Sequence, residues 1–376
     1  MSKPIQINQA VPIYKGYRST RVRSLFNVTP EAGARFQAEC ALPVDEADWQ
    51  VGLIVGPSGS GKSSIGRACW GAAAYHEPFA WRPDRPIIED IGQDLDFNAV
   101  TGALSAVGLG DAPAWLRPYQ VLSTGEKFRA ELARLLLEGP RQVVVDEFTS
   151  VVDRQIARIG AAAFTKAWRR TAGRQVILLS CHRDIIEWVS PDWLLDTEDM
   201  SLQRGRLWRR PDIAIDILAT NWRPWPTFEP HHYLKLPLMV GASNYVALHA
   251  GEPVAHLAVS TCVGLKTARM CRLVVMPEWQ GAGVGLRFMN YVAERWLRGE
   301  NRYSKPMTTV FHTSHPGLTA ALLRQPCWMY MHGRVLGEGG QKSYVTMSKS
   351  RGRESRCRYG GHMRAVQSFR YVGGAA

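Results

Sequence analysis

The chain has 376 residues and a formal net charge of +13 at pH 7, and this length allows two domains, each with a core of its own. No stretch reaches the roughly 18 apolar residues needed to cross a bilayer, and the N-terminus lacks the apolar core of a signal peptide, so we expect no membrane partner. The seven cysteines are odd in number and form no Cys-x-x-Cys pair, which favours a reduced, cytoplasmic protein over a disulfide framework.

The charge is divided unevenly between the two halves of the chain. Residues 1–217 hold 26 lysines and arginines against 26 acids, whereas residues 218–376 hold 20 against 7 glutamates and no aspartate. The whole excess therefore lies in the second half. A neutral half beside a basic half favours contact with a polyanion, above all nucleic acid. Solubility, or binding of an anionic cofactor, is the alternative.

A phosphate-binding motif follows the first apolar strand. The run Trp49–Val55 leads into Gly-Pro-Ser-Gly-Ser-Gly-Lys-Ser at residues 56–63. Backbone N–H groups of such a turn cradle phosphates at the N-terminus of the next helix. We expect Lys62 to reach the terminal phosphates and Ser63 to bind Mg²⁺. The predicted ATP-binding residues of this loop are Gly56, Ser58, Gly59, Gly61, Lys62, Ser63 and Ser64.

Further motifs follow downstream. The segment Leu-Ser-Thr-Gly-Glu at 122–126 precedes a helical run over Lys127–Leu137. The apolar run Gln142–Val145 then ends in Asp146 and Glu147, which are placed to hold Mg²⁺ through water and to polarise an attacking water. After Asp153 comes a second apolar strand, Val176–Ser180, which ends close to His182.

This order of motifs resembles an ABC-type ATPase over about the first 215 residues. The resemblance implies that Glu147 is the catalytic carboxylate and that His182 is the switch histidine at the γ-phosphate. It also implies that Ser123 and Gly125 bind the γ-phosphate of ATP held at a partner site. Gln93 is the candidate for the family's Gln-loop residue, which binds ATP and Mg²⁺.

The chain departs from the family pattern in two places. Its signature reads Leu-Ser-Thr-Gly-Glu where the common form is Leu-Ser-Gly-Gly-Gln, and the 61 residues from Lys62 to Ser123 are few for the family. The short interval argues against the helical arm that grips membrane subunits, and so against transport. One P-loop and one signature imply an ATP-dependent homodimer or pairing with another ABC protein. Phe26 and Phe36 remain alternatives for stacking on adenine.

A change of composition marks the predicted domain boundary. Gln203–Pro211 is typical of a last hairpin, and Thr220–Thr227 is rich in Pro and Trp without periodicity. We predict domains at 1–217 and 218–376.

The second half alternates short strands with a helix. The predicted elements are a hairpin of Asn244–His249 with Pro253–Ser260, a strand over Met270–Met276, a helix over Leu286–Arg298 and a strand over Thr308–Thr313. Between the third strand and the helix lies Gln-Gly-Ala-Gly-Val-Gly at 280–285, whose N–H groups suit a pyrophosphate.

That loop after a Val-Val-x-Pro strand end resembles motif A of the GNAT acyltransferases, and the resemblance covers residues 225–324. The predicted fold class is therefore α/β, a P-loop ABC ATPase domain followed by a GNAT-like acyltransferase domain. The resemblance implies acetyl-CoA or a related acyl-CoA, with the acyl carbonyl along the strand around Val274 and Val275. Its pyrophosphate would lie on Gln280, Gly281, Gly283 and Gly285. Another anion site is the alternative.

The base of acyl transfer has several candidates. Glu278 lies close to the coenzyme loop, and the pair His232 and Tyr233 lies where GNAT proteins place substrate-binding helices. Ser314 and His315 follow a strand end and are candidates for contact with substrate or cofactor. Ordinary surface or core roles are the alternative for each.

The last 50 residues leave the fold open. Either Gly361–Gly373 or, less well, His315–His332 resembles a closing helix–strand unit. In the first case residues 325–360 form an insertion whose basic residues suit phosphate contacts. These residues are Lys349, Arg351, Arg353, Arg356 and Arg358. A zinc site is a further alternative, with the atypically spaced ligands Cys327, His332, Cys357 and His362.

The leading functional prediction is an ATP-hydrolysing ATPase fused to an N-acyltransferase that modifies nucleic acid, with a DNA base amine favoured. The fusion resembles modification proteins of phages and mobile elements, including the Mom-like group. One alternative is a protein or small-amine acetyltransferase regulated by its ATPase domain. Another is an ATP-gated DNA-binding module with an inactive GNAT half.

Overall fold

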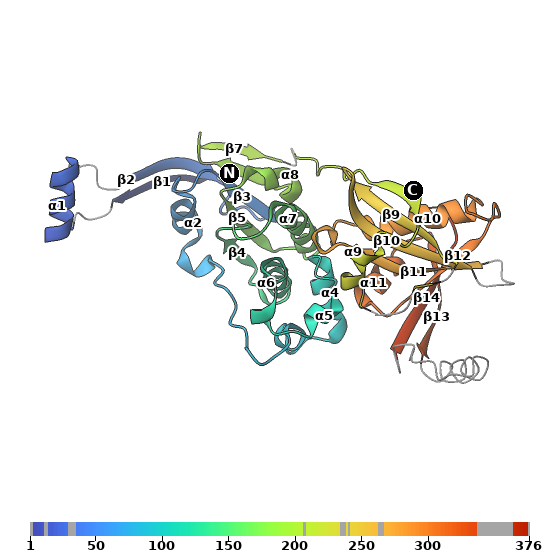
Figure 1. Cartoon of the computed structure of the whole chain (residues 1–376). Coiled ribbons are helices and arrows are strands. Elements are labelled where there is room, and N and C mark those ends of the chain that lie inside the picture. Colours follow the sequence, from blue (N-terminus) through green and yellow to red (C-terminus); the bar gives the residue numbers. More distant parts are fainter. Residues whose placement is uncertain are drawn as a thin grey trace. The chain divides into compact units, whose positions relative to one another are not determined.

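The computed structural model describes residues 3–10, 14–28, 35–205, 208–233, 238–239, 241–261, 267–336 and 364–374. These residues belong to two compact units. The first unit combines Met1–Ala80 with Glu138–Pro211, and the second combines Trp81–Leu137 with Asp212–Ala376. Each unit contains a sheet covered by helices (Figure 1), which agrees with the predicted α/β class. The predicted boundary between residues 217 and 218 stays a prediction.

The first unit is built on a five-stranded sheet in the order β4-β5-β3-β6-β7. The bounds are β3 Val51–Val55, β4 Gln142–Val145, β5 Gln175–Ser180, β6 Trp193–Asp196 and β7 Ser201–Arg204. The first four strands are parallel, and β7 is antiparallel to β6. Because helices cover parallel strands on both faces, β3 reads as a continuous apolar run and is buried along its whole length.

Helices and a separate hairpin complete this unit. The helices are α2 Lys62–Trp70, α7 Arg154–Trp168 and α8 Ile186–Val189. The strands β1 Lys3–Ala10 and β2 Arg35–Leu42 form an antiparallel pair, and α1 Tyr17–Phe26 lies between them in sequence. Phe26 of α1 is 73% exposed, and the side chain of Phe36 lies outside the described residues, so the choice of adenine-stacking residue stays open.

The second unit contains a helical part and a seven-stranded sheet. The helices of the first part are α3 Ile87–Asp90, α4 Phe97–Ala106, α5 Ala112–Trp115 and α6 Thr124–Glu138. The sheet has the order β13-β14-β12-β11-β10-β9-β8. Its strands are β8 Asp216–Thr220, β9 Ser243–His249, β10 Glu252–Thr261, β11 Thr267–Val275, β12 Thr308–Thr313, β13 Trp328–Leu336 and β14 Arg364–Tyr371. All neighbours are antiparallel except β11 and β12.

Helices cover both faces of this sheet. Trp296 of α10 Val284–Leu297 donates a hydrogen bond from Nε1 to the Tyr245 hydroxyl at 2.9 Å. The next residue on β9, Val246, packs instead with Trp225 and Phe228 of α9 Trp225–Phe228. Since successive side chains of a strand point to opposite faces, α10 and α9 lie on opposite sides of the sheet.

The two parallel strands separate toward their carboxyl ends. β11 pairs with β12 from Thr267 to Met270, while its pairing with β10 continues to Val275. The β10–β11 register shifts opposite Leu257, and Arg272 in the shifted stretch has φ +55°, which marks a bulge. The peptide groups of β11 beyond Met270 thus face the gap between the separating strands.

The sequence predictions for the second half hold for most elements. The hairpin, the third strand, the helix and the strand over Thr308–Thr313 are confirmed within a few residues. The prediction of a helix–strand unit over Gly361–Gly373 is wrong in its described part, because Arg364–Tyr371 is a strand that inserts between β12 and β13. The helix–strand unit is instead α11 Pro316–Leu323 with β13. Lys349–Arg358 lie outside the described residues.

In the part of the chain that the structure describes, no helix combines the length and apolar character needed to cross a bilayer.

One carboxylate fixes the start of the central strand. Asp192 Oδ2 accepts hydrogen bonds from the backbone N–H groups of Gln50 and Val51 at 2.8 and 2.9 Å. Arg169, the C-cap residue of α7, pairs with the same oxygen at 2.7 Å. Burial alone would raise the pKa of Asp192, but Arg169 and the two N–H groups outweigh it and lower that pKa.

We predict that Asp192→Asn lowers the free energy of unfolding by about 2 kcal/mol at pH 7, because the charge-assisted bonds are lost. A lowered folded-state pKa stabilises the protein above the unfolded-state pKa, and this effect is lost as pH falls through the folded-state pKa. The difference between variant and parent in urea unfolding should therefore be full at pH 7 and shrink below pH ~4. Asp45→Asn, in an exposed turn, is the control. A difference that does not change with pH would contradict the assignment.

Candidate active site

The first candidate site lies at the carboxyl edge of the parallel sheet in the first unit. The P-loop follows β3, Asp146 and Glu147 follow β4, and His182 follows β5, which lies between β3 and β4. Carboxyl ends of parallel strands meet at one edge of the sheet, where ligands bind in open α/β sheets. The structure thus brings the P-loop, both acids and the histidine to one edge.

Glycines shape the P-loop in the way that a phosphate cradle requires. Gly59 and Gly61 have φ of +79° and +87°, and Gly61 caps the N-terminus of α2. A Cβ at Gly59 would meet no atom of the described residues within 4 Å, so among them the space over the loop is open to a ligand. At Gly56, by contrast, a Cβ would lie 1.9 Å from Thr197 Oγ1. Gly56 is therefore required for the loop to pack against the sheet.

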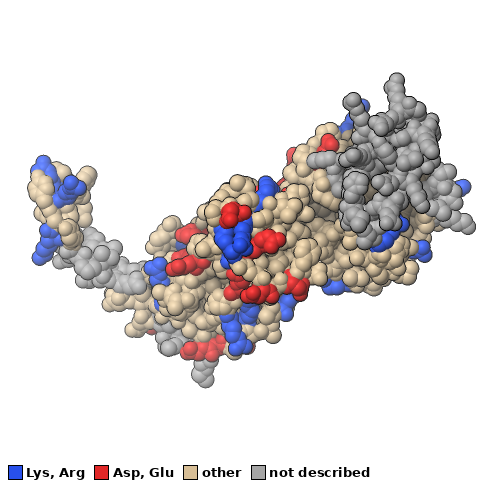
Figure 2. Space-filling model, turned by 90° about the horizontal axis from the view of Figure 1, so that it is seen from below, with Lys and Arg blue, Asp and Glu red and all other residues tan. Residues whose placement is uncertain are grey.

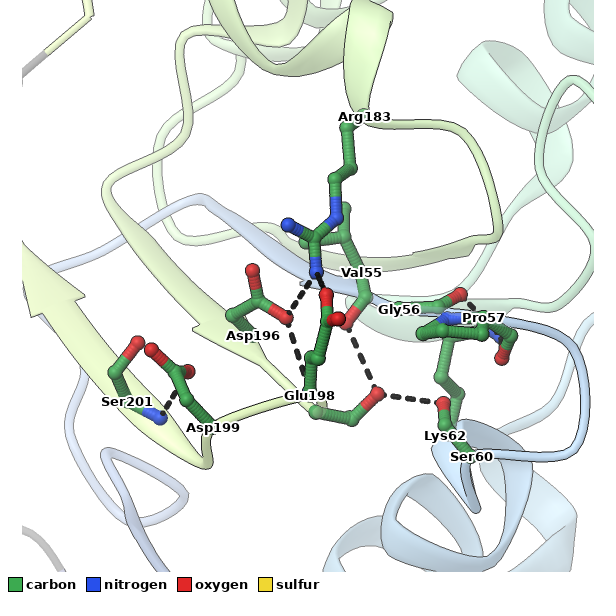
Figure 3. Close-up of polar contacts among 11 residues, drawn as sticks. Val55, Gly56, Pro57, Ser60, Lys62, Arg183, Asp196, Glu198, Asp199 and Ser201 are labelled. Carbon is green, nitrogen blue, oxygen red and sulfur yellow. Dashed lines mark hydrogen bonds and ion pairs between the residues drawn. The ribbon is translucent and has the colours of Figure 1, made fainter.

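Hydrogen bonds of Lys62 (Figure 3) and of Thr197 hold the loop in place. Lys62 Nζ donates to the carbonyl oxygens of Gly56 and Pro57 at 2.9 and 2.7 Å. Thr197 Oγ1 donates to the Val55 carbonyl at 3.1 Å and lies 2.5 Å from Ser60 Oγ. Thr197 was not predicted from the sequence, because 142 residues separate it from Val55.

The two acids differ in exposure and in backbone conformation. Asp146 Oδ1 accepts the Glu147 N–H at 2.9 Å, and Ser150 Oγ donates to Glu147 Oε2 at 2.6 Å. Glu147 is exposed and has φ +50°, an uncommon conformation for a non-glycine residue. Such strain accumulates at functional sites, which supports the predicted catalytic role of Glu147.

Charged pairs order the loops beside this edge. The N–H of His182 donates to Ser180 Oγ at 3.1 Å, and the next residue, Arg183, pairs with Asp196 at 2.8 Å and with Glu198 (Figure 3). Asp184 pairs with Arg158 at 2.9 Å and with Arg154. The segment that carries His182 is thus fixed to both α7 and the end of β6.

The signature segment, in the second unit, begins α6. Ser123 Oγ accepts the Glu126 N–H at 3.3 Å and Glu126 Oε2 accepts the Ser123 N–H at 2.8 Å, a reciprocal capping box. Glu126 in place of the common Gln keeps this cap and adds a negative charge at the N-terminus of the helix. Ser123 is exposed and Gly125 is buried.

Gln93 is exposed in the turn between α3 and α4, and its predicted role in binding ATP and Mg²⁺ stays a prediction.

The second candidate site is the loop between β11 and α10. Gly281 and Gly283 have φ of +90° and +78°, and Gly283 caps α10. In the described part of the chain, a Cβ at Gly283 would meet nothing within 4 Å, whereas one at Gly285 would lie 3.0 Å from Val275 Cγ2. Gln280 Nε2 donates to the Val275 carbonyl at 3.1 Å, which closes the loop on the strand end. The N-terminus of α10 thus offers open N–H groups to an anion.

Glu278 lies on the turn before this loop and faces a buried arginine. Burial lowers the pKa of Arg129 on α6 to about 10, and the charges of Glu278 and Glu126 offset part of that effect. Arg129 is 2% exposed, and its Nε and Nη2 atoms have no hydrogen-bond partner among the described residues. Glu278 therefore lies in the electrostatic field of Arg129, a neighbour that was not predicted from the sequence.

His232 and Tyr233 lie beside an aromatic cluster on the α9 face. The His232 ring is 5.2 Å from Tyr233 and 5.6 Å from Trp225, and His232 is 6% exposed. His256 of β10 is fully buried in the same cluster, next to the bulge of β11. Burial lowers its pKa to about 4, so His256 is neutral. Sequence reasoning missed His256, although a lone histidine in the apolar run Pro253–Ser260 was a visible signal.

His315 caps α11 and contacts the helical part of its unit. Its Nδ1 accepts the Leu318 N–H at 3.2 Å, so the proton lies on Nε2, which donates to the Gly110 carbonyl at 2.9 Å. Burial lowers the pKa of His315, in agreement with a neutral ring. Ser314 Oγ is buried without a hydrogen-bond partner in the described part of the chain.

Of the ligands in the zinc alternative, Cys357 and His362 lie outside the described residues.

Comparison with known proteins supports both the ATPase domain and the acyltransferase domain. A model described as the acetyltransferase (GNAT) family matches residues 213–317. The cytochrome c biogenesis ATP-binding export protein CcmA of Rhodospirillum rubrum is 33% identical over 165 residues, covering 35% of this chain and 68% of that protein. CcmA of Paramagnetospirillum magneticum is 30% identical, with 75% of its length covered. The zinc import ATP-binding protein ZnuC of Pseudomonas aeruginosa is 33% identical over 144 residues, 33% of this chain. The chain spans 54% of that relative.

A search of solved structures found the dimeric ATP-binding cassette MJ0796 bound to ADP and Pi. It aligns with a TM-score of 0.38 and 13% identity, covering 54% of this chain and 98% of that one.

The two CcmA relatives show that the chain belongs to the ATP-binding cassette ATPases. Its second half also carries a GNAT acetyltransferase domain. ATP with Mg²⁺ and acetyl-CoA are the corresponding ligands. The residues fit them. The glycines over the P-loop and at the start of α10 leave open space, and the Ser63 hydroxyl and the Asp146 carboxylate are oxygen donors of the kind that Mg²⁺ prefers.

We predict that Glu147→Gln keeps ATP binding but lowers ATP hydrolysis at least about 100-fold, because the carboxylate no longer orients and polarises water. Phosphate release and binding of a fluorescent ATP analogue measure the two effects. Lys62→Ala should weaken ATP binding itself. Glu187→Gln, at an exposed position of α8, is the matched control and should behave like the parent protein. Hydrolysis at the parental rate in Glu147→Gln would assign the catalytic carboxylate elsewhere.

Proposed function

We propose that the protein is an ATP-hydrolysing acyl-CoA-dependent N-acyltransferase that modifies an amine of a nucleic-acid base, with DNA favoured. It acts as an ATP-dependent dimer, because one P-loop and one signature per chain need a second copy or another ABC protein to complete a nucleotide sandwich. Coupling of hydrolysis to transfer is part of the same proposal.

The observation that carries the choice of acceptor is the positive charge of the GNAT half. The excess of +13 lies wholly in residues 218–376. Among the described residues, His312 of β12 lies in the field of Arg269, Arg334 and His332, which come from β11 and β13. Burial and then these neighbours lower the pKa of His312 to about 4. A polyanion would neutralise the charges of Arg269 and Arg334 beside His312.

This positive group is local. On the face shown in Figure 2, lysine and arginine side chains of the described residues are scattered, in the middle of the view beside aspartates and glutamates, and form no single broad basic field. Support for a polyanion therefore comes from Arg269 on β11, Arg334 on β13 and the total charge of the second half. Strong salt dependence of binding is the expected signature.

The chemistry is a single acyl transfer. The acceptor nitrogen attacks the thioester carbonyl, the new C–N bond forms, the C–S bond breaks, and the thiolate of the coenzyme leaves. Glu278 and His232 are the candidates for receiving the proton of the amine, and Tyr233 is a candidate for donating a proton to the leaving thiolate. An exocyclic base amine is a weak nucleophile whose lone pair is delocalised into the ring, so the base has to leave the helix stack to react. A dimer driven by ATP would supply a clamp that distorts the duplex.

The proposal predicts a new nucleoside in cells that express the protein. Mass spectrometry of digested DNA and RNA should detect a nucleoside heavier by one acyl group. Gly283→Glu, which places a carboxylate at the N-terminus of α10, should abolish it by repelling the pyrophosphate. Gly251→Glu is the matched control, because it lies in the hairpin turn of β9 and β10, where an added Cβ meets nothing within 4 Å.

Unchanged DNA and RNA pools, together with acetyl-CoA binding by the purified protein, would refute a nucleic-acid acceptor. A protein or small amine would then take its place. Loss of the nucleoside in Lys62→Ala as well would support the coupling of ATP to transfer.

A further inference from the structure

A short segment of the helical part lies across the coenzyme loop within the second unit. Residues 107–111, here called the blocking segment, connect α4 with α5. The Gly110 N–H donates to Gln280 Oε1 at 3.0 Å, and the Gly110 carbonyl accepts from His315 Nε2 at 2.9 Å. Gln280 follows β11 and His315 follows β12, so one residue bridges the carboxyl ends of the two strands that separate.

The contact is a close one between backbones. Gly108 has φ +85°, and a Cβ there would lie 2.3 Å from the Gln280 carbonyl oxygen and 3.4 Å from the Gly281 nitrogen. A Cβ at Gly317 of α11 would lie 2.2 Å from Ser105 Oγ of α4. These distances leave no room for another molecule between the blocking segment and the first residues of the coenzyme loop. In Figure 1, α4 and α11 lie side by side, and the two helices are in contact.

The blocking segment is packed into the core of its unit and is further held by Trp115. Val107 and Leu109 are 0% and 2% exposed. Trp115 Nε1 donates to the Leu109 carbonyl at 2.7 Å, and the Trp115 ring lies 5.3 Å from that of His315. The segment is therefore held in this position by its own core and not by the two hydrogen bonds alone.

The position has a consequence for the coenzyme. An acyl-CoA with its pyrophosphate on the loop has to pass its acyl arm from Gln280–Gly285 toward Val274, through the gap between β11 and β12. The blocking segment occupies the Gln280–Gly281 end of that path, while the Gly283 end stays open. We propose that the blocking segment and acyl-CoA compete for the coenzyme loop, so that acyl-CoA binds in full when the segment withdraws. This inference rests on the proposed acyltransferase function.

A continuous set of polar contacts joins the blocking segment to the ABC signature. Ser123 and Glu126 cap each other at the start of α6. Arg117 pairs with Glu126 at 2.7 Å and with Asp111 at 3.7 Å, and Asp111 is the last residue of the blocking segment. A γ-phosphate bound at Ser123 would compete for the bonds of this capping box. ATP engagement at the signature is therefore the event expected to release the blocking segment.

The test is the affinity for acetyl-CoA of the full chain with Gly108→Ala. The added methyl group collides with Gln280 only in the docked state, so it favours withdrawal. If the undocked fraction of the parent protein is a tenth or less, the variant should bind acetyl-CoA at least about tenfold more tightly in isothermal titration. Gly251→Ala is the control for backbone strain, because Gly251 also has φ +85° but has open space around it. Equal affinities in Gly108→Ala and Gly251→Ala would overturn the competition.

Hydrogen exchange on the parent protein supplies an independent readout that needs no variant. Acetyl-CoA should increase exchange at residues 105–111 while it protects residues 280–286. Protection at 280–286 with unchanged exchange at 105–111 would overturn the blocking role and leave the coenzyme site intact. Unchanged exchange at both segments under saturating acetyl-CoA would refute binding of acetyl-CoA at the coenzyme loop, and with it the blocking role of residues 107–111.

Discussion

Both candidate sites depend on one constraint: a buried strand has to turn into a helix within a few residues and still leave its N–H groups free for an anion. At the end of β3 this turn uses left-handed glycines at 59 and 61, and at the end of β11 it uses them at 281 and 283. In each loop the glycine just before the helix is its N-cap, and no side chain of the described residues fills the space above Gly59 or Gly283. The chain thus builds two candidate anion sites of the same physical kind on two different sheets.

What surrounds each turn decides how it can be used. The P-loop is fixed to its own sheet by Thr197 and by Lys62, both in the first unit. The coenzyme loop is fixed partly by its own strand, through Gln280 and Val275, and partly by Gly110 of the helical part. Since that helical part also carries the signature of the ATPase, the two activities share a structural element. Competition at this element would let the state of the nucleotide govern the loading of acyl-CoA, a coupling between two binding equilibria.

The sequence predicts the candidate sites best where the functional residues are consecutive in the chain. The P-loop, the acids after β4 and the coenzyme loop follow from short motifs, and the strands beside them follow from apolar runs. Contacts between distant residues were not predictable: 170 residues separate Gly110 from Gln280, and 205 separate it from His315. The strand Arg364–Tyr371 was taken for part of a helix–strand unit, because its position between β12 and β13 is a tertiary feature that local periodicity does not encode. His256 was missed because its significance comes from the rings around it and from the bulge opposite.

The most direct test of the account is the affinity for acetyl-CoA with and without ATP, measured on the Glu147→Gln variant so that the nucleotide is not consumed. Coupling of the two sites predicts at least about tenfold tighter binding of acetyl-CoA when ATP is saturating, and by reciprocity the same gain for ATP when acetyl-CoA is saturating. An affinity for acetyl-CoA that is the same with and without bound ATP would contradict the coupling of the two sites.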